Sequence, residues 1–396
     1  MDKRQNYDVI IAGGGPAGAS AATHLALRGA RVLLLEQKQF PRPKLCGEFI
    51  SPECALHFER LGVKDQMFAA RPASLKETVF YSRTGRHVSV PSSWFSSSGV
   101  ALGLSRAEMD ERLLRRAAAA GTQVLENASV SNLVIEDKQV RGVKVKQGDS
   151  EETYRAAITV DATGRARALA RHLAARKSYH RQRPMIAFKA HLEKTEVATE
   201  ACEIYFYRGG YGGLSSIEDG LSNLCFIASA RDVRACGADA DRVMRDVVCE
   251  NQRARITLRK ALLHSEWLAV SLEGFGCHEV APAPGLLAVG DAASFIDPFT
   301  GSGMLMALES GELAGKIIGA HLDGNAQSES VDDLRAKYSA AYHRAFASRL
   351  TVCSFLRRAA FVPGLAETAI RFFAASSGLR HRLARATRGT DVAQTV

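Results

Sequence analysis

The chain has 396 residues, 46% of them hydrophobic and 24% charged, with a formal net charge of +10 and no low-complexity tract. This length exceeds the size at which one core keeps growing, so two packed domains are expected, and the composition argues against disorder. No run approaches the roughly eighteen apolar residues of a membrane span, and the polar lead before Tyr7 is too short for a signal peptide, so we expect a cytoplasmic protein. The eight cysteines form no CxxC pair and no cluster with histidine, so neither disulfides nor a metal site is expected.

Residues 7–36 predict a βαβ unit, because an apolar run, a glycine-rich turn and an alanine-rich helix are followed by a second apolar run. The turn contains the GxGxxG pattern, whose glycines permit a tight turn, close approach to a pyrophosphate and close helix packing. The helix N-terminus then faces the phosphates, and the acid at the end of the second run is placed to bind ribose hydroxyls. The binding residues of this unit are Gly13, Gly15, Pro16, Ala17, Gly18 and Glu36.

The middle of the chain changes in character. Ser105 followed by Glu108 predicts a capping box and a helix to about residue 120, and short β-like runs fill residues 122–160. Longer β runs follow over about 180–275, with one helix expected near Ala238–Asn251.

Residues 285–320 return to the strand-turn-helix style, and helices broken at Pro363 and Gly378 are expected after residue 331. The sequence thus predicts an α/β fold with a Rossmann-like domain and a sheet-rich α+β substrate domain. We assign the dinucleotide domain to 1–75, 100–178 and 275–330, the substrate domain to 76–99 and 179–274, and a helical C-terminal region to 331–396.

Two further segments resemble motifs of a large superfamily of FAD-dependent oxidoreductases, which contains geranylgeranyl reductases, aromatic-ring hydroxylases (class A flavin monooxygenases) and flavin-dependent halogenases. Residues 158–165 resemble its Asp-Gly motif, with Ala162 in place of the usual glycine, and residues 287–303 resemble its third motif. The resemblance implies that FAD is bound, with Asp291 on the ribityl hydroxyls and a helix from Ser302 beneath the isoalloxazine. Free N–H groups at that helix start would stabilise negative charge on the reduced ring. The further cofactor-binding residues that it implies are Lys44, Arg106, Val130, Asp161, Gly164, Gly290, Asp291, Pro298, Gly301, Gly303 and Met304.

The loop at residues 44–52 resembles a Lys-x-Cys-Gly segment that lines the flavin and substrate cavity of geranylgeranyl reductases. Cys46 lies between Lys44 and Glu48, so its thiol would act as an acid or redox group with a lowered pKa. A small buried residue in a flavin-covering loop is the alternative for Cys46, and Glu48 is a second candidate catalytic residue.

The glycine-rich segment 209–217 stands where reductases of the superfamily have an aromatic-rich segment and halogenases have a Trp-x-Trp motif. Its glycines indicate backbone close to flavin or substrate, and Tyr211 is a candidate catalytic residue that either binds substrate or only packs. Because the only tryptophans are Trp94 and Trp267, halogenation loses support. Lys76 stands near the essential lysine of halogenases, although an exposed surface lysine is the commoner explanation.

Two enzymatic functions compete. The first is a geranylgeranyl reductase-like transfer of hydride between flavin N5 and a carbon–carbon double bond of a hydrophobic or aromatic small molecule. The second is an NAD(P)H-dependent monooxygenase, whose site must exclude water until oxygen transfer. No second strand-bound GxGxxG occurs, so NAD(P)H or another external reductant would act without its own domain. A halogenase, a non-enzymatic flavin-binding protein and a flavin-free nicotinamide dehydrogenase remain as weaker alternatives, and no nucleic-acid partner is expected.

The end of the chain is strongly basic: from residue 341 there are nine arginines, two acids and no lysine, which gives 9 − 2 = +7. Apolar residues such as Phe355 and Phe372 interleave with these arginines, as in helices with one apolar and one cationic face. Such a face suits an anionic membrane surface, an acidic carrier protein or a phosphorylated substrate. Alternatively, the apolar residues dock the helices on the body of the protein.

Overall fold

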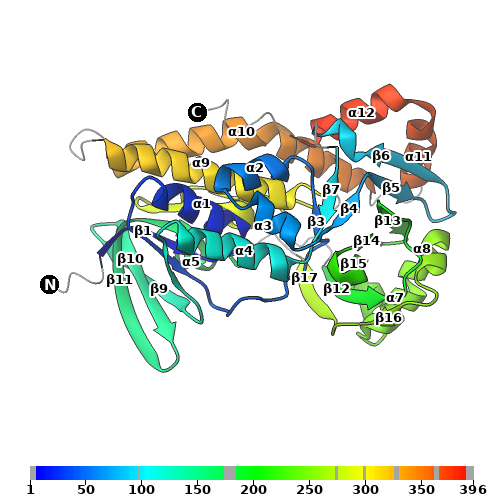
Figure 1. Cartoon of the computed structure of the whole chain (residues 1–396), viewed down its shortest axis with the longest axis horizontal. Coiled ribbons are helices and arrows are strands. Elements are labelled where there is room, and N and C mark those ends of the chain that lie inside the picture. The colour runs from blue at the N-terminus through cyan, green and yellow to red at the C-terminus, as the bar shows by residue number, and fades with distance from the viewer. Residues whose placement is uncertain are drawn as a thin grey trace.

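A computed structural model describes residues 6–96, 99–173, 184–272, 275–297, 300–324, 330–360 and 365–388 of the chain. Two large β-sheets lie at opposite ends of the molecule, and helices cover the first sheet and the region between the two (Figure 1). This mixed architecture confirms the predicted α/β class. Within the described ranges no helix is both long and apolar enough to span a membrane.

The first sheet is built around the predicted βαβ unit. Its strand order is β8-β2-β1-β11-β10-β9, with β19 beside β11, and β8, β2, β1, β11 and β19 run parallel. Helix α1 connects β1 to β2, as the sequence predicts. The bounds are β1 Asn6–Ala12, α1 Pro16–Ala26, β2 Val32–Leu35, β8 Gln123–Leu125, β9 Ser129–Glu136, β10 Gln139–Gln147, β11 Ser150–Asp161 and β19 Leu286–Ala288.

The second sheet has the order β16-β12-β15-β14-β13-β5-β6, with β17 also paired to β12. Only the β5–β13 pair is parallel. Strands β5 and β6 come from an early segment and the others from residues 185–272, whereas the domain boundaries themselves stay a prediction. The bounds are β5 Glu77–Tyr81, β6 His87–Pro91, β12 Met185–Glu193, β13 Ala201–Tyr207, β14 Gly210–Ser216, β15 Ser222–Ser229, β16 Leu262–Leu263 and β17 Leu268–Leu272.

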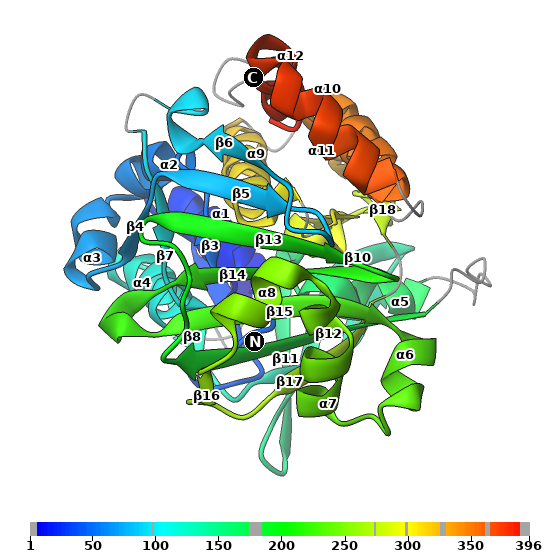
Figure 2. The same ribbon diagram turned by 90° about the vertical axis from the view of Figure 1, so that its right-hand side faces the viewer.

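Smaller elements join the two sheets. A three-stranded sheet, β3-β7-β4, lies between them, and β18 pairs with β20. Helices α6, α7 and α8 cover one face of the second sheet (Figure 2). The bounds are β3 Phe49–Ile50, α2 Cys54–Leu61, α3 Lys64–Ala69, β4 Ala73–Leu75, β7 Ala101–Gly103, α4 Arg106–Ala119, α5 Ala168–Leu173, α6 Ala230–Ala235, α7 Ala240–Asp246, α8 Gln252–Thr257, β18 Gly276–Cys277, β20 Ser294–Phe295, α9 Gly303–Asp323, α10 Val331–Ala360, α11 Leu365–Ala375 and α12 Ser377–Ala386.

Helices α1 and α9 pack side by side at unusually close range. A Cβ atom on Gly311 would lie 2.4 Å from Ala17 O, one on Gly315 2.6 Å from His24 Cβ, and one on Gly319 2.5 Å from Arg28 Nε. Glycines at every fourth position of α9 therefore let the two backbones approach. Because both helices are held together, their N-termini open at the same edge of the first sheet.

Two details of the predicted elements are wrong. The single helix expected near Ala238–Asn251 is divided, because Asp239 caps α7 and Asn251 caps α8. The Asn251 amide also donates to Ser82 O and Phe206 O, both at 3.0 Å, so tertiary contacts with the sheet fix this second helix start.

The helix break expected at Gly378 falls instead at Ser376, which has an extended backbone and caps α12 with its hydroxyl. The break expected at Pro363 lies outside the described residues. The glycine-rich segment after Arg208 forms the inner strand β14. A Cβ on Gly210 would lie 2.0 Å from Ile227 O, so strand packing alone requires glycine there.

Candidate cofactor and substrate site

The three motif strands end side by side. In the parallel register, Ala12 at the end of β1 pairs with Asp161 of β11, which pairs with Ala288 of β19. Ala162 N donates to Ala12 O at 2.8 Å, and Val289 N donates to Asp161 O at 3.0 Å. Because ligands bind at the carboxyl edge of such sheets, the three distant segments form one site at this edge.

The turns after these strands touch one another through glycine. Gly13 has a φ of +111°, and a Cβ there would lie 2.3 Å from Ala162 O. A Cβ on Gly18 would lie 1.9 Å from Gly13 O, and one on Gly290 would lie 2.8 Å from Ala17 Cβ. Side chains at these three positions would force the turns apart. Gly13, Gly18 and Gly290 are therefore required by the protein's own packing, before any ligand is considered.

Gly15 behaves differently from those three glycines. It precedes Pro16 at the N-terminus of α1, has an ordinary φ of −70°, and a Cβ there would meet only Arg106 Nη2, at 3.9 Å. The protein itself leaves room for a side chain at this position. A ligand that approaches the helix N-terminus closely gives the physical reason for glycine here.

Asp291 is the free acid of the site. Its carboxylate accepts no hydrogen bond from any described residue, and burial raises its pKa although the charges of Arg165, Arg106 and Lys44 oppose the shift. A carboxylate held this way has its acceptor oxygens available for hydroxyl groups of a ligand. The ribityl-binding role that the resemblance implies for Asp291 stays a prediction.

Lys44 lies in a cluster of charged side chains at this edge. Its pKa is lowered by burial first and then by the nearby charges of Arg106, Arg42 and Arg165. Together with Asp291, these side chains form a cationic cluster with one acid. Such a cluster complements a pyrophosphate attached to a polyhydroxyl chain.

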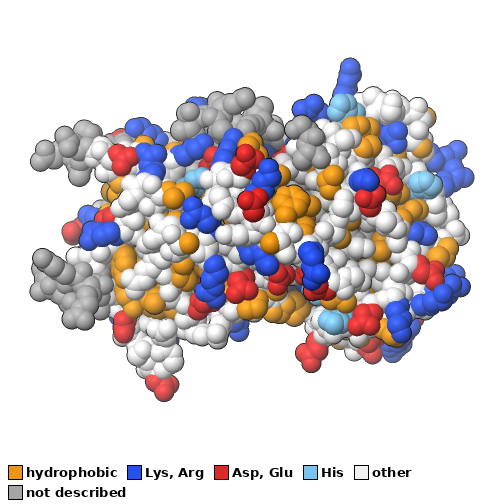
Figure 3. Space-filling model, in the orientation of Figure 1, with side chains coloured by type: hydrophobic (Ala, Val, Ile, Leu, Met, Phe, Trp, Pro, Cys, Tyr) orange, Lys and Arg blue, Asp and Glu red, His pale blue; other side chains and the backbone are white. Residues whose placement is uncertain are grey.

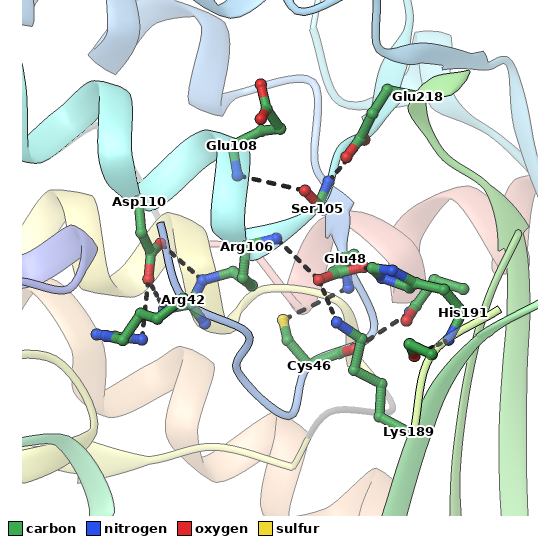
Figure 4. Close-up of polar contacts among 12 residues, drawn as sticks. Arg42, Cys46, Glu48, Ser105, Arg106, Glu108, Asp110, Lys189, His191 and Glu218 are labelled. Atoms are coloured by element: carbon green, nitrogen blue, oxygen red, sulfur yellow. Dashed lines mark hydrogen bonds and ion pairs between the residues drawn. The ribbon is translucent and has the colours of Figure 1, made fainter. Parts of the chain in front are cut away.

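Arg106 is the first residue of α4 and belongs to this cationic cluster. Its guanidinium makes two hydrogen bonds of 2.7 Å to Asp110, one turn later on the helix (Figure 4). Burial would lower the pKa of Arg106, but the charge of Asp110, its hydrogen bonds and the contribution of Cys46 together outweigh burial and raise it. Asp110, which the sequence analysis missed, therefore orients the Arg106 guanidinium, and its i, i+4 spacing was the available signal.

Ser105 caps this helix as predicted, since its hydroxyl accepts from Glu108 N at 3.2 Å. The other half of the capping box is wrong. The backbone N–H of Ser105 donates to Glu218, between β14 and β15 of the second sheet, at 2.9 Å (Figure 4). The Glu108 carboxylate instead accepts from Arg112. The helix start thus also ties the two sheets together.

Glu36 and Arg42 lie at the GxGxxG turn. Glu36 accepts from Gly14 N at 2.9 Å and from Lys38 N at 3.0 Å, so its carboxylate is bonded to this turn, and its contact with ribose hydroxyls stays a prediction. The Arg42 Nε and Nη1 atoms are buried without a hydrogen-bond partner, although Nη1 lies 3.6 Å from Asp110 Oδ2. Arg42 is a second residue that sequence reasoning missed, and its unused donors suit an anionic group.

Asp161 is occupied by contacts within its own segment. Its carboxylate accepts hydrogen bonds from the Thr163 N–H and hydroxyl, at 3.1 and 2.6 Å, and from Ala170 N at 3.0 Å. It therefore holds its own turn and the start of α5, and any contact of this segment with a cofactor would come from the backbone near Gly164. Its direct role in binding stays a prediction that these contacts do not support.

The remaining predicted cofactor residues are divided between two places. Met304 lies buried at the start of α9, next to Gly303, and Gly301 has a φ of +62° with a Cβ position 3.2 Å from Phe49. Val130 lies on β9, two residues after Ala128, whose N–H donates to Glu36 O at 2.9 Å. Their cofactor contacts stay predictions, and Pro298 lies outside the described residues.

The Cys46 loop is fixed between the two sheets by Glu48 (Figure 4). The Glu48 carboxylate is fully buried and bonds Lys189 Nζ at 2.5 Å, His191 Nε2 at 2.7 Å and the backbone N–H of Arg106 at 2.8 Å. Burial would raise the pKa of Glu48, but the hydrogen bond from His191 and the charge of Lys189 outweigh it and lower the pKa. An acid that stays ionised in this way suits a positioning role and does not suit proton donation.

Cys46 itself lies on the cofactor side of these Glu48 contacts. Its thiol helps to raise the pKa of Arg106, its Sγ accepts from Glu48 N at 3.4 Å, and its carbonyl accepts from Asn223 of β15 at 3.1 Å. The predicted neighbourhood of cation and acid is therefore present, but the neighbouring cation is Arg106. Whether Cys46 is catalytic stays a prediction.

An apolar cavity of about 250 Å³ opens next to this loop. Side chains alternate along the second sheet, so that Tyr205 and Phe226 point toward α6–α8 while Phe206, Ile227 and Tyr211 point into the cavity. Its inner end is formed by Gly47 of the Cys46 loop and by Thr300 and Gly301 of the third motif. The cavity therefore connects the sheet to the cofactor edge.

Tyr211 lines this cavity and is nearly fully buried. Its hydroxyl donates a hydrogen bond to Asp297 in the third motif, so the substrate-side strand β14 and the cofactor-side turn are joined at the cavity wall. Lys76, in contrast, pairs with Glu200 at 2.8 Å on the surface and does not line the cavity.

The basic C-terminal helices form the outer wall of the same cavity. Ile370 and Phe373 of α11 and Leu383 of α12 line it. Arg388 closes one end, donating to Thr300 O at 2.8 Å and pairing with Glu53 at 3.0 Å. The predicted docking of these helices on the body is therefore present on their inner faces.

Comparison with known proteins agrees with this geometry. A family described as "FAD binding domain" matches residues 6–348. A digeranylgeranylglycerophospholipid reductase of Methanosarcina mazei is 28% identical over 319 residues, which cover 79% of this chain and 75% of that protein. Among solved structures, a geranylgeranyl bacteriochlorophyll reductase-like protein from Thermoplasma acidophilum has a TM-score of 0.81 at 20% identity, covering 98% of both chains. The flavin-dependent brominase Bmp2 has a TM-score of 0.80 at 20% identity, covering 96% of this chain and 93% of that one, and this likeness concerns the fold.

Proposed function

This chain belongs to the FAD binding domain family and is an FAD-dependent oxidoreductase of the geranylgeranyl reductase-like kind, and we propose that it reduces carbon–carbon double bonds of an isoprenoid-like hydrophobic substrate. The residues at the sheet edge fit FAD: Gly15 leaves space at a helix N-terminus, Asp291 offers free acceptor oxygens, and Arg42 offers unused donors. Each of these features is explained by a bound dinucleotide.

The observation that carries the proposal is the apolar cavity that ends at the cofactor edge. Its walls are largely aliphatic and aromatic, including Val88, Phe206, Ile227 and Ile370, and its inner end is formed by backbone at Gly47 and Gly301. Burial of a hydrocarbon chain against such walls contributes about 25 cal/mol per Å² of apolar surface. A hydrophobic chain is therefore favoured there, with one end placed at the cofactor.

When bound and reduced, FAD supplies a hydride to one carbon of a double bond, and the other carbon takes a proton. The chain's own contribution is to exclude water and to orient the substrate. The Glu48 contacts with Lys189 and His191 hold the Cys46 loop against the cavity, and Arg388 holds the third-motif turn at the other side. These contacts keep the two walls of the site at a fixed separation.

Tyr211 and Cys46 are the candidate proton donors. Tyr211 lines the cavity, and its hydroxyl would give its proton to the substrate carbon, after which a proton taken up from solvent through Asp297 would restore the hydroxyl. Cys46 lies by Arg106 on the cofactor side. Since Tyr211 reaches the cavity itself, we assign proton donation to Tyr211 and a covering role to Cys46. The electrons would come from NAD(P)H or another external reductant.

An anaerobic single turnover tests this function. The purified protein, reduced with dithionite, would be mixed with geranylgeranyl phosphate in detergent, and flavin absorbance and product mass would be followed. We expect the flavin to be reoxidised and the product to gain two hydrogens per bond reduced. Tyr211→Phe should slow this step, and Cys46→Ser should leave it nearly unchanged.

Flavin that stays reduced without oxygen, together with substrate-dependent oxygen uptake in air, would contradict the reductase and indicate a monooxygenase. If Cys46→Ser abolished turnover while FAD content stayed intact, the roles assigned to Cys46 and Tyr211 would be reversed.

A further inference from the structure

The outer faces of the C-terminal helices share an unusual composition. At the end of α10, in α11 and in α12, each outer face presents one large apolar residue beside exposed arginine: Phe355 with Arg358, Phe372 with Arg371, and Leu379 with Arg382 and Arg385. We call these seven residues the outer patch. In α10 and α12 the spacing is that of one helix face, 355 with 358 and 382 with 385, whereas in α11 the two patch residues are neighbours in sequence.

The two phenylalanines of the outer patch are the most exposed large hydrophobic residues in the described part of the chain. Phe355 is 69% exposed and Phe372 is 61% exposed, whereas Leu27 follows at 54%. Aromatic side chains that project this far into water bury only a minor part of their surface within their own protein. Their number in so short a segment marks an interaction surface.

The arginines of the outer patch are also uncommitted. None of Arg358, Arg371, Arg382 and Arg385 forms an ion pair with a described residue, while the other arginines of these helices are engaged. Arg349 pairs with Glu309, and Arg388 pairs with Glu53. Figure 3 shows Lys and Arg side chains projecting from the upper right edge of the molecule, where Figure 1 places α11 and α12, with hydrophobic side chains among them.

The outer patch is continuous with the cavity. The Phe372 ring contacts Phe373, with ring centroids 5.9 Å apart, and Phe373 lines the cavity. Leu356 at the end of α10 and Leu383 of α12 line it as well, one residue from the exposed positions Phe355 and Arg382. The cavity residues Leu356, Phe373 and Leu383 are thus sequence neighbours of Phe355, Phe372 and Arg382, so the outer patch borders the wall of the cavity.

We propose that the outer patch docks the protein on the surface of an anionic lipid bilayer, from which the hydrophobic substrate passes between these helices into the cavity. Phenylalanine inserts at the boundary between headgroups and acyl chains, and arginine binds anionic headgroups while its stem stays in the apolar layer. The bilayer is thus the partner whose chemistry matches both halves of the patch. The route of the substrate rests on the proposed function, but the docking does not.

Sedimentation of the whole protein with lipid vesicles tests the docking. Vesicles of phosphatidylcholine alone would be compared with vesicles that also contain phosphatidylserine, each at low and high salt. We expect pelleting with the anionic vesicles only, reduced by salt because the Debye length shortens. Replacing the four patch arginines by glutamine should weaken this binding by at least about tenfold, since each basic residue near such a surface contributes.

Two further variants make the test specific. Phe355→Gln with Phe372→Gln should also weaken binding to anionic vesicles, whereas Ile135→Gln with Ile256→Gln, which changes two residues that are each 50% exposed on other elements, should bind like the parent. Equal or absent pelleting in all conditions would overturn the proposal. So would normal binding by the phenylalanine variant, because it would indicate a purely electrostatic contact of the kind made with an acidic protein.

Turnover separates this proposal from the proposed function. The patch variants should reduce detergent-dispersed substrate at the parental rate and lose rate only when the substrate is embedded in vesicles. Vesicle binding without any double-bond reduction would refute the proposed function and leave the docking in place. Equal loss of rate with both substrate preparations would overturn the docking route.

Discussion

The cofactor edge and the apolar cavity meet at Gly301 and Gly47, but they are built by different means. At the cofactor edge, backbone atoms of Gly13, Ala162 and Gly290 are packed so closely that single Cβ atoms would not fit. The walls of the apolar cavity are side chains from the second sheet, from the small three-stranded sheet and from the three C-terminal helices. Short motifs determine the first region, because backbone geometry depends on neighbouring residues, whereas the second depends on which distant segments meet.

This difference predicts where substitutions act. Changes at the cofactor edge should cost the cofactor or the fold, since the turns cannot yield. We call the Glu48 contacts with Lys189 and His191 the joint between the regions. Changes in this joint should lower the stability of the fold, and changes outside both regions should have little effect.

Gly13→Val should have the largest effect. The new Cβ would lie 2.3 Å from Ala162 O at a φ of +111°, so the first and second motifs would be forced apart and bound flavin lost. The ratio of flavin to protein absorbance after purification measures this. Gly29→Ala is the matched control: its φ is +84° but nothing lies within 4 Å, so it should cost about 1–2 kcal/mol and retain FAD. Retention of flavin by Gly13→Val would contradict the close contact.

Glu48→Gln should have the next largest effect, on the joint between the regions. It leaves the buried Lys189 without its anion, so we expect a loss of about 3–5 kcal/mol in the free energy of unfolding. Because the folded-state pKa of Glu48 is lowered, its stabilisation is present above the ordinary carboxyl pKa of about 4.3 and is lost as pH falls through the lowered value.

Chemical unfolding at neutral and acidic pH would measure both effects, and the difference between parent and Glu48→Gln should shrink on acidification. Glu59→Gln, which removes an exposed pair with Lys64, is the control and should change stability by about 0–1 kcal/mol. A pH-independent difference would mean that the charge of Glu48 is not what stabilises the joint.

Asp291→Ala should weaken FAD binding by about 1.5–3 kcal/mol, or roughly 10–150-fold, without loss of apoprotein stability. The raised pKa of Asp291 means that its favourable contribution exists only at low pH and is lost as pH rises, so the ionised acid does not stabilise the apoprotein at neutral pH. Asp161→Ala, in contrast, removes the acceptor of three hydrogen bonds and should destabilise the apoprotein. Flavin titration and thermal unfolding of both variants would test this contrast, and identical behaviour would refute it.

Lys76→Ala should have the smallest effect. Its pair with Glu200 is exposed and lies outside the cavity, so stability should change by less than about 1 kcal/mol and turnover should not change. A large loss of turnover would place Lys76 in the chemistry, as in a halogenase, and would contradict the boundary of the cavity described above.

The glycine spacing at Gly13–Gly18 and the acid at Glu36 were sufficient to predict the βαβ unit, because turn geometry and helix polarity are local properties of the chain. The Ser105 cap was predictable for the same reason. Its missing partner was not: Glu218 lies 113 residues away and accepts the bond that Glu108 was expected to accept. The glycines at every fourth position, Gly311, Gly315 and Gly319, were visible in the sequence. They indicate close helix packing, but they do not show which helix is the partner.

The sequence by itself therefore determined the dinucleotide fold, the cofactor and the basic, apolar-interleaved C-terminal helices. Only the tertiary structure decided that Asp161 holds its own turn, that Glu48 is fixed by Lys189 and His191, and that the C-terminal helices form one wall of the cavity. The physical reason is that charge state and burial depend on groups far apart in the chain. Backbone turns and helix periodicity, in contrast, depend on neighbours that the sequence places together.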